Sequence, residues 1–347
     1  RFTSDGYTPG DIINHGTLLA ASGGSISLAG GRAVNTGRIV ADYGQVNLAS
    51  GKTAVVSFDP AGMIGFEVSG DVEQNITGAE SAVSNTGSLQ SQAGRVVLEA
   101  NVAADVFTYA VNNEGMISAH RINNVGGEVH LLGNDGTTVH SGHIDAYGDN
   151  GQGGSVFLLG DNVGVFEAGS IQASGDQGGG TVLIGGDWQG EGDTQTASRT
   201  YLSDESSVSA DAVITGDGGK VVAWADESTL YLGHISARGG AEAGDGGQVE
   251  VSGKQALIFE GKVDLSSTNG DVGKLLLDPA DIEISNAANS DITAASPFSD
   301  LTDDGDTSVL NITTLQGALN TADVTVTTTT SAGNAPLNGT ITVKEAV

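Results

Sequence analysis

The sequence feature that most constrains the fold is a short phrase that returns along the chain. The phrase consists of a glycine, a variable residue, a valine, a second variable residue and an apolar residue. Successive valines stand 27, 26, 39 and 28 residues apart at Val129, Val156, Val182, Val221 and Val249. A propeller blade needs roughly 40 residues, so this period fits it poorly. The spacing favours a solenoid, in which each repeat contacts only its neighbours.

A second phrase alternates with the first and has the order glycine, variable, apolar, variable, small. It occurs at Gly37–Ala41, Gly115–Ala119, Gly142–Ala146, Gly169–Ala173 and Gly233–Ala237. Both phrases alternate with period two, which indicates short strands with one buried face. Two or three such strands in a coil of about 25 residues predict a parallel β-helix, in which coils stack about 4.8 Å apart.

A finer repeat places an asparagine two residues before the glycine in four coils, at Asn14, Asn35, Asn85 and Asn113. Asparagines stacked at one turn position form a hydrogen-bonded ladder of side-chain amides. In later coils the residue two positions before the glycine is His140, Glu167, Tyr231 or Phe259. We predict that these residues continue the same column. We interpret the change as a new turn type inside one all-β solenoid.

The repeat weakens after Leu277, which suggests a division of the chain into residues 1–285 and 286–347. The first part is predicted to be the β-helix stalk. The second is predicted to be an acidic linker followed by the start of a small β-rich module. That module would hold one short helix near 313–320 and strands at 324–327 and 340–343.

Charge and composition exclude several classes of function. Thirteen Lys and Arg stand against 43 Asp and Glu, a net charge of −30. Such a chain repels nucleic-acid phosphates and anionic membranes. It has no cysteine, so it has no disulfides and no thiolate sites. The sequence contains no run of 18 apolar residues, so it predicts no helix that inserts into a membrane. The first ten residues do not form a signal peptide, and we expect them to lie inside a longer chain.

Several phrases resemble the filamentous haemagglutinin-like exoproteins of two-partner secretion, a family of adhesins and haem-utilisation proteins. They are Gln45–Gly51, Gly179–Asp187, Ala237–Gly240, Gly247–Lys254 and Leu275–Pro279. The resemblance implies a right-handed β-helix, export through an outer-membrane transporter, and a location outside a Gram-negative cell or on its surface. The Asn-Pro-Asn-Gly type motif of the family's secretion region is absent. We therefore expect this chain to be the stalk that follows that region.

Two groups of acidic residues are candidate calcium sites, because carboxylate oxygens suit this ion. Asp303, Asp304 and Asp306 surround a turn, and Asp187 with Glu191 and Asp193 forms a looser group. Neither matches the EF-hand or the nonapeptide calcium motif. For both groups, a solvated acidic loop is the favoured alternative.

Trp188 and Tyr201 are candidate sugar-binding residues. They lie near the two ends of an insertion in the repeat. Long loops on a rigid scaffold often carry binding residues, and aromatic faces stack on sugars. The favoured alternative is that Trp188 covers the end of a column of apolar residues.

Nothing in the sequence forms a recognisable catalytic site, and we expect no catalytic residue and no cofactor. His140 and His143 make a weak metal pair at most, and Glu128 and Glu250 are acids of distant coils. The sequence therefore predicts a non-catalytic adhesive stalk that spaces a distal region and offers a surface for glycan or matrix. The alternatives are a polysaccharide-active enzyme and the stalk of a contact-dependent toxin.

Overall fold

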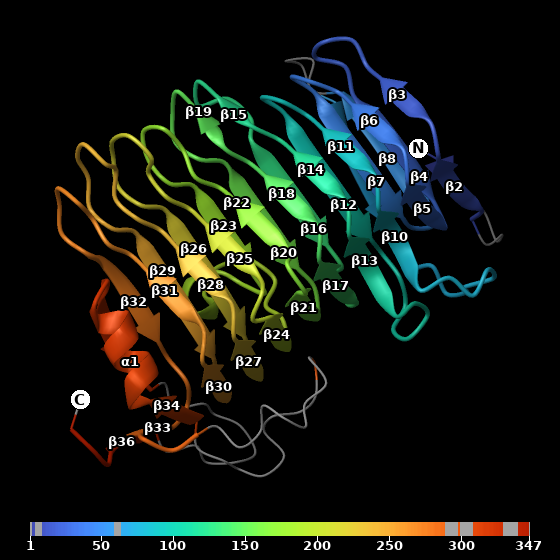
Figure 1. Ribbon diagram of the computed structural model, residues 1–347. Helices are drawn as coiled ribbons and strands as arrows, with labels where there is room; N and C mark the ends of the chain where they lie inside the picture. Colours follow the sequence, from blue (N-terminus) through green and yellow to red (C-terminus); the bar gives the residue numbers. More distant parts are fainter. Residues whose placement is uncertain are drawn as a thin grey trace.

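A computed structural model describes residues 2–3, 9–58, 64–288, 298, 308–328 and 339–346. It is a parallel β-helix in which each coil contributes one strand to each of three long faces (Figure 1). The predicted fold class is confirmed. In the order of the chain, each coil passes from the first face to the second and then to the third.

The strands of the first face are β2 (Asp11–Asn14), β5 (Arg32–Asn35), β10 (Ser81–Asn85), β13 (Tyr109–Asn113), β17 (Thr137–His140), β21 (Asn162–Val165), β24 (Arg199–Leu202), β27 (Ser228–Tyr231) and β30 (Ala256–Phe259). Those of the second are β3 (Thr17–Leu19), β6 (Arg38–Val40), β11 (Ser88–Gln90), β14 (Met116–Ser118), β18 (His143–Asp145), β22 (Ser170–Gln172), β25 (Ser207–Ser209), β28 (His234–Ser236) and β31 (Lys262–Asp264). The third face holds β4 (Ile26–Gly30), β7 (Gln45–Ser50), β12 (Arg95–Ala100), β16 (Glu128–Leu132), β20 (Ser155–Leu159), β23 (Thr181–Ile184), β26 (Lys220–Ala225), β29 (Gln248–Gly253), β32 (Gly273–Leu277) and β35 (Ala322–Val326).

The repeated phrases stack in register, as the periodicity predicts. On the third face Val129 is paired with Val156, and Val156 with Val182. All three are fully buried, and they belong to one hydrophobic cluster that continues from coil to coil. Because alternate residues of a strand point to opposite faces, this pairing gives the solenoid one continuous apolar core.

The corner between the first and second faces carries the predicted amide ladder. Asn14 donates from Nδ2 to Oδ1 of Asn35 (2.8 Å), Asn35 to Asn85 (2.8 Å), and Asn85 to Asn113 (2.7 Å). Asn113 Nδ2 lies 2.9 Å from Nδ1 of His140. The next position is Val165, not Glu167, so that prediction is wrong.

The longest insertions in the repeat leave from one corner, between the third and first faces. The hairpin of β8 (Thr53–Phe58) and β9 (Ile64–Ser69) follows β7, and β1 (Phe2–Thr3) pairs with it. The short 3₁₀ turn η1 (Trp188–Gly190) follows β23, and β33 (Ile282–Ser285) follows β32. Two minor strands, β15 (Arg121–Ile122) and β19 (Gly148–Asp149), pair at the corner between the second and third faces.

Most described residues after 285 pack on the last coil, whereas the ring of Phe298 lies 5.8 Å from that of Phe166 in an earlier coil. Strand β34 (Ser308–Asn311) pairs with β33, as does β36 (Ile341–Val343), and β35 extends the third face beyond β32. Helix α1 (Ile312–Leu319) contacts β31, β34 and β35, and Asn311 caps its N-terminus. The core cluster includes residues of α1 and β34, so the described residues form one core on both sides of residue 285.

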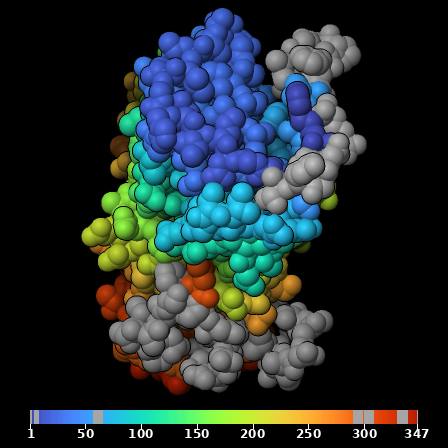
Figure 2. All heavy atoms as spheres, turned by 90° about the vertical axis from the view of Figure 1, so that its right-hand side faces the viewer, coloured from blue at the N-terminus to red at the C-terminus, as the bar shows by residue number. Residues whose placement is uncertain are grey.

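The opposite end of the solenoid presents the strands of the first coil. β2, β3 and β4 are the edge strands of the three faces (Figure 1). Figure 2 looks onto this end of the molecule, where residues near the N-terminus are blue. Ile13 and Leu19, from β2 and β3, are 46% and 69% exposed. The inward residues Ile12, Leu18 and Ile26 are only partly buried, because among the described residues no further coil lies over them.

Candidate binding groove at one corner of the solenoid

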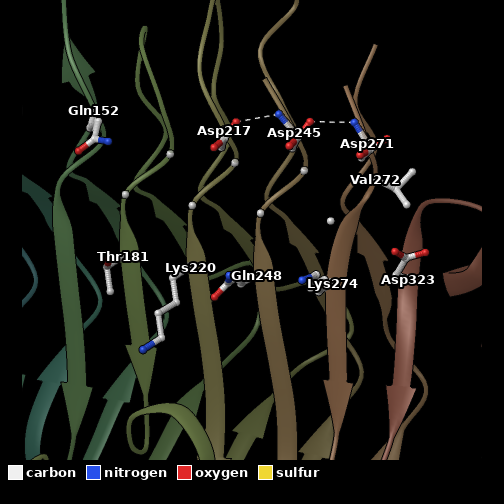
Figure 3. A pocket seen from close by; sticks show the side chains of 17 residues that line it. Gln152, Thr181, Asp217, Lys220, Asp245, Gln248, Asp271, Val272, Lys274 and Asp323 are labelled. Carbon is white, nitrogen blue, oxygen red and sulfur yellow. Dashed lines mark hydrogen bonds between the residues drawn. The ribbon is translucent and has the colours of Figure 1, made fainter. Parts of the chain in front are cut away.

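A groove of about 900 Å³ runs across successive coils where the second face turns into the third (Figure 3). This volume lies in the range of small-molecule sites. Its walls come from segments that stand one coil apart. The largest contributions come from residues 217–220, 245–248 and 271–274, joined by residues from 152, 179–181 and 323.

Glycines form the floor of the groove, and close stacking of the coils requires them. A Cβ on Gly219 would lie 2.1 Å from the carbonyl oxygen of Gly180, and one on Gly247 would lie 2.1 Å from that of Gly219. Contacts this short are far inside van der Waals distance, so these positions accept no side chain. The bare floor leaves room between the polar side chains on either side.

One row of polar side chains in the groove is acidic, and its members are linked along the axis. Asp245 N donates to Oδ1 of Asp217, and Asp271 N donates to Oδ1 of Asp245, both at 2.8 Å. Figure 3 shows these two bonds as dashed lines between successive coils. Because each bond uses one carboxylate oxygen, the second oxygen of Asp217 and of Asp245 is left to accept from a ligand.

The second row lies at the start of the strands of the third face, and its side chains are mixed in charge. Lys220 is paired with Gln248, and Gln248 with Lys274. Asp323 follows in β35. Coils are about 4.8 Å apart, so both rows repeat at that pitch along the groove. The groove therefore offers hydrogen-bond donors and acceptors at regular intervals, and it has no aromatic side chain among its lining residues.

The two aromatic residues proposed for sugar binding lie on different faces. Trp188 follows the third face and packs on Leu183, Val222 and Trp224. Tyr201 belongs to β24 of the first face, where its ring lies 5.0 Å from that of Phe166. They do not form one platform, and the groove lies at another corner.

The candidate calcium residues Asp303, Asp304 and Asp306 lie outside the described residues. In the second group, Asp187 forms an ion pair with Lys220, while Glu191 and Asp193 are exposed. In the part of the chain that the structure describes, no three His, Asp or Glu side chains are placed to hold a metal ion.

The remaining candidate residues have structural partners. His140 is fully buried, and its Nε2 lies 3.1 Å from the carbonyl oxygen of Ser170. His143 is bound through Nδ1 to the hydroxyl of that serine (2.7 Å). Glu128 pairs with Arg95 at the first position of its strand, whereas Glu250 occupies the third position of its own. The two glutamates therefore lie in different columns and make no acid pair.

The groove escaped the sequence analysis because its walls are assembled from residues 26 to 28 positions apart. The sequence does contain a signal for the groove. It is a four-residue pattern that consists of an acidic or amide residue, two glycines and a polar residue. This order occurs at 217–220 and 245–248, and with one glycine replaced by valine at 271–274.

Comparison with known proteins is informative at the level of solved structures. No family model matches the chain, and no curated protein does. Among solved structures, the secretion domain of HMW1 from Haemophilus influenzae is similar, with 27% identity and a TM-score of 0.64. The alignment covers 80% of this chain and 68% of that one. The chain resembles a two-partner-secretion exoprotein.

The expected resemblance is thus confirmed for a region of such an exoprotein. The similar structure is itself a secretion domain, so the place of this chain in a stalk stays a prediction. No helix among the described residues is long and apolar enough to cross a membrane.

Proposed function

We propose that this chain is a rigid, non-catalytic part of a secreted exoprotein, exported with an outer-membrane transporter, and that its groove binds glycan. Export is supported by the similarity to a secretion domain. The rigid spacer is supported by three faces that stay in register through the described coils. Ten strands on the third face, about 4.8 Å apart, give a rod on the order of 45 Å.

The observation that carries glycan binding is the regular pitch of the polar groove. A sugar chain presents hydroxyl groups that both donate and accept hydrogen bonds, once per ring. The acidic row accepts them, and Gln248 and Lys274 donate from the other row. The repeat of one coil is close to the length of one pyranose ring in an extended chain, so successive rings meet equivalent side chains.

Contacts of this kind are individually weak. A single hydrogen bond contributes about 0.5–1.5 kcal/mol net, and the groove has no aromatic ring to add stacking. We therefore expect affinity to increase with the number of sugar rings. Adhesion would come from many weak contacts acting together.

A glycan array probed with the whole chain tests this proposal. The variant Gln248→Ala with Lys274→Ala should lose about tenfold in retention, since tenfold corresponds to about 1.4 kcal/mol. The matched control, Lys254→Ala with Gln255→Ala, changes the same residue types outside the groove and should keep wild-type retention. Equal loss in both variants, or no bound glycan, would overturn the proposal. Release of oligosaccharides from a polysaccharide would overturn its non-catalytic part.

A further inference from the structure

A second feature, separate from the groove, lies on the outer side of the third face. There the turn η1 covers a small apolar cluster made of Leu183, Val222 and Trp224, with Trp188 packed against it. The turn contacts both β26 and β29. We call the segment from Asp187 to Glu191 the cover loop.

A glutamate is buried beneath the cover loop. Glu250 is paired with Val222 on one side and Leu276 on the other, so it occupies a position that is apolar in both neighbouring coils. Its side chain is fully buried. Its Oε2 accepts a hydrogen bond from the backbone N–H of Gln189 in the cover loop (2.7 Å). A buried carboxyl group thus links the loop directly to the sheet.

Other contacts hold the two ends of the loop. Asp187 forms an ion pair with Lys220 and accepts a hydrogen bond from the N–H of Trp188 (2.6 Å). The ammonium of Lys220 lies 5.9 Å from the centre of the Trp188 ring. Gly190 has a φ of +63°, and a Cβ there would lie 2.6 Å from the Trp224 ring, so only glycine fits this close approach.

We propose that the cover loop is a latch controlled by the protonation of Glu250. With Glu250 neutral, the loop lies closed on the apolar cluster. When Glu250 ionises, its charge requires water, and the loop moves away from the sheet to admit it. Opening then exposes Leu183, Val222 and Trp224.

The groups around Glu250 place this change near neutral pH. Burial raises the pKa of Glu250 to about 7, and the hydrogen bond from Gln189 opposes that rise. Ser252 on the same strand and Lys220 on β26 also favour the charged form, whereas Asp278 after β32 disfavours it. Because the folded pKa lies above the unfolded value of 4.5, the closed form loses stability as pH rises from 4.5 through 7.

Intrinsic fluorescence tests the latch without a label, because the only two tryptophans, Trp188 and Trp224, both lie in this cluster. Between pH 5 and pH 8, tryptophan emission of the whole chain should shift to the red. Quenching by acrylamide should rise severalfold. The variant Glu250→Gln should show the closed signal at both pH values, since an amide oxygen still accepts from Gln189 and carries no charge.

The control is Glu242→Gln, a change at an exposed glutamate away from the cluster, which should keep the wild-type response. Hydrogen exchange at the Gln189 amide gives a second reading if Glu250→Gln lowers stability. As pH rises from 5 to 7, exchange should accelerate beyond the increase in the intrinsic rate, and only in wild type. A wild-type signal that does not change with pH would overturn the latch. So would a Glu250→Gln variant that responds as wild type does.

Discussion

The first and second halves of the solenoid fill the same inward corner with opposite chemistry. In the early coils this position holds Asn14, Asn35, Asn85 and Asn113, and each amide is the hydrogen-bond partner of the next. In the later coils it holds Val165, Leu202, Tyr231 and Phe259, which are buried in the hydrophobic core. The strands pair in parallel from coil to coil in both halves.

The comparison shows that stacking can be specified in two ways. Each amide of the ladder has fixed donor and acceptor directions, and several also donate to the glycine two residues on, as Asn35 does to Gly37 (3.2 Å). Because a buried amide without its partner costs free energy, the ladder fixes the register. The apolar column requires only matched volume, so it tolerates exchange of residues of similar size.

The sharpest test of this difference removes one amide from the middle of the ladder. Asn85→Leu leaves Asn35 Nδ2 and Asn113 Oδ1 each without one buried partner, at about 1–3 kcal/mol for each group. We expect the free energy of unfolding at pH 7 to fall by about 4 kcal/mol, measured by denaturant titration.

The matched control lies in the apolar half. Leu202→Met keeps the volume and should cost less than about 1.5 kcal/mol. Equal losses for Asn85→Leu and Leu202→Met would show that both halves depend on volume alone.

The junction between the halves gives a second, pH-dependent test. Burial lowers the pKa of His140 to about 4, below the ordinary 6.5. The unfolded chain therefore binds the proton more tightly, and stability is present above pH 6.5 and lost as pH falls toward 4. The shift corresponds to about 3 kcal/mol.

The variant His140→Asn extends the amide ladder by one step and removes the titrating group. Its stability should depend less on pH between 6.5 and 4 than that of wild type, in thermal unfolding at several pH values. His234→Asn, at an exposed histidine, should leave the wild-type dependence unchanged. If His140→Asn follows the wild-type curve, His140 does not set the acid sensitivity of the junction.

Much of this fold could be predicted from the sequence because its determinants are local and repeated. The glycine phrases mark strands, and the Asn-x-Gly spacing correctly places four amides and His140 in one column. The same count failed at Glu167, because the turn there is longer: Val165 holds the column, and Glu167 lies in the turn with a φ of +51°. A fixed offset from glycine fails where the turn length changes.

The candidate site could be predicted less well, because it depends on which corner each loop leaves. Trp188 and Tyr201 are 13 residues apart in sequence, yet one packs on the third face and the other on the first. Asp217 and Asp245 are 28 residues apart and are joined by a hydrogen bond. In a solenoid, separation by one full coil brings residues together, whereas separation by half a coil places them on different faces.

The smallest expected effect comes from the one hydroxyl group in the apolar half of the column. Tyr231 is fully buried, its ring lies 5.2 Å from that of Phe259, and its hydroxyl donates to the carbonyl oxygen of Lys262. Tyr231→Phe keeps the contact between the two rings and removes one hydrogen bond, which should cost about 1 kcal/mol in denaturant unfolding. Since the ring contact is unchanged and the volume nearly so, the loss should stay well below that of Asn85→Leu. A loss as large as that of Asn85→Leu would mean that polar contacts also hold the later coils in register, and the contrast between the halves would disappear.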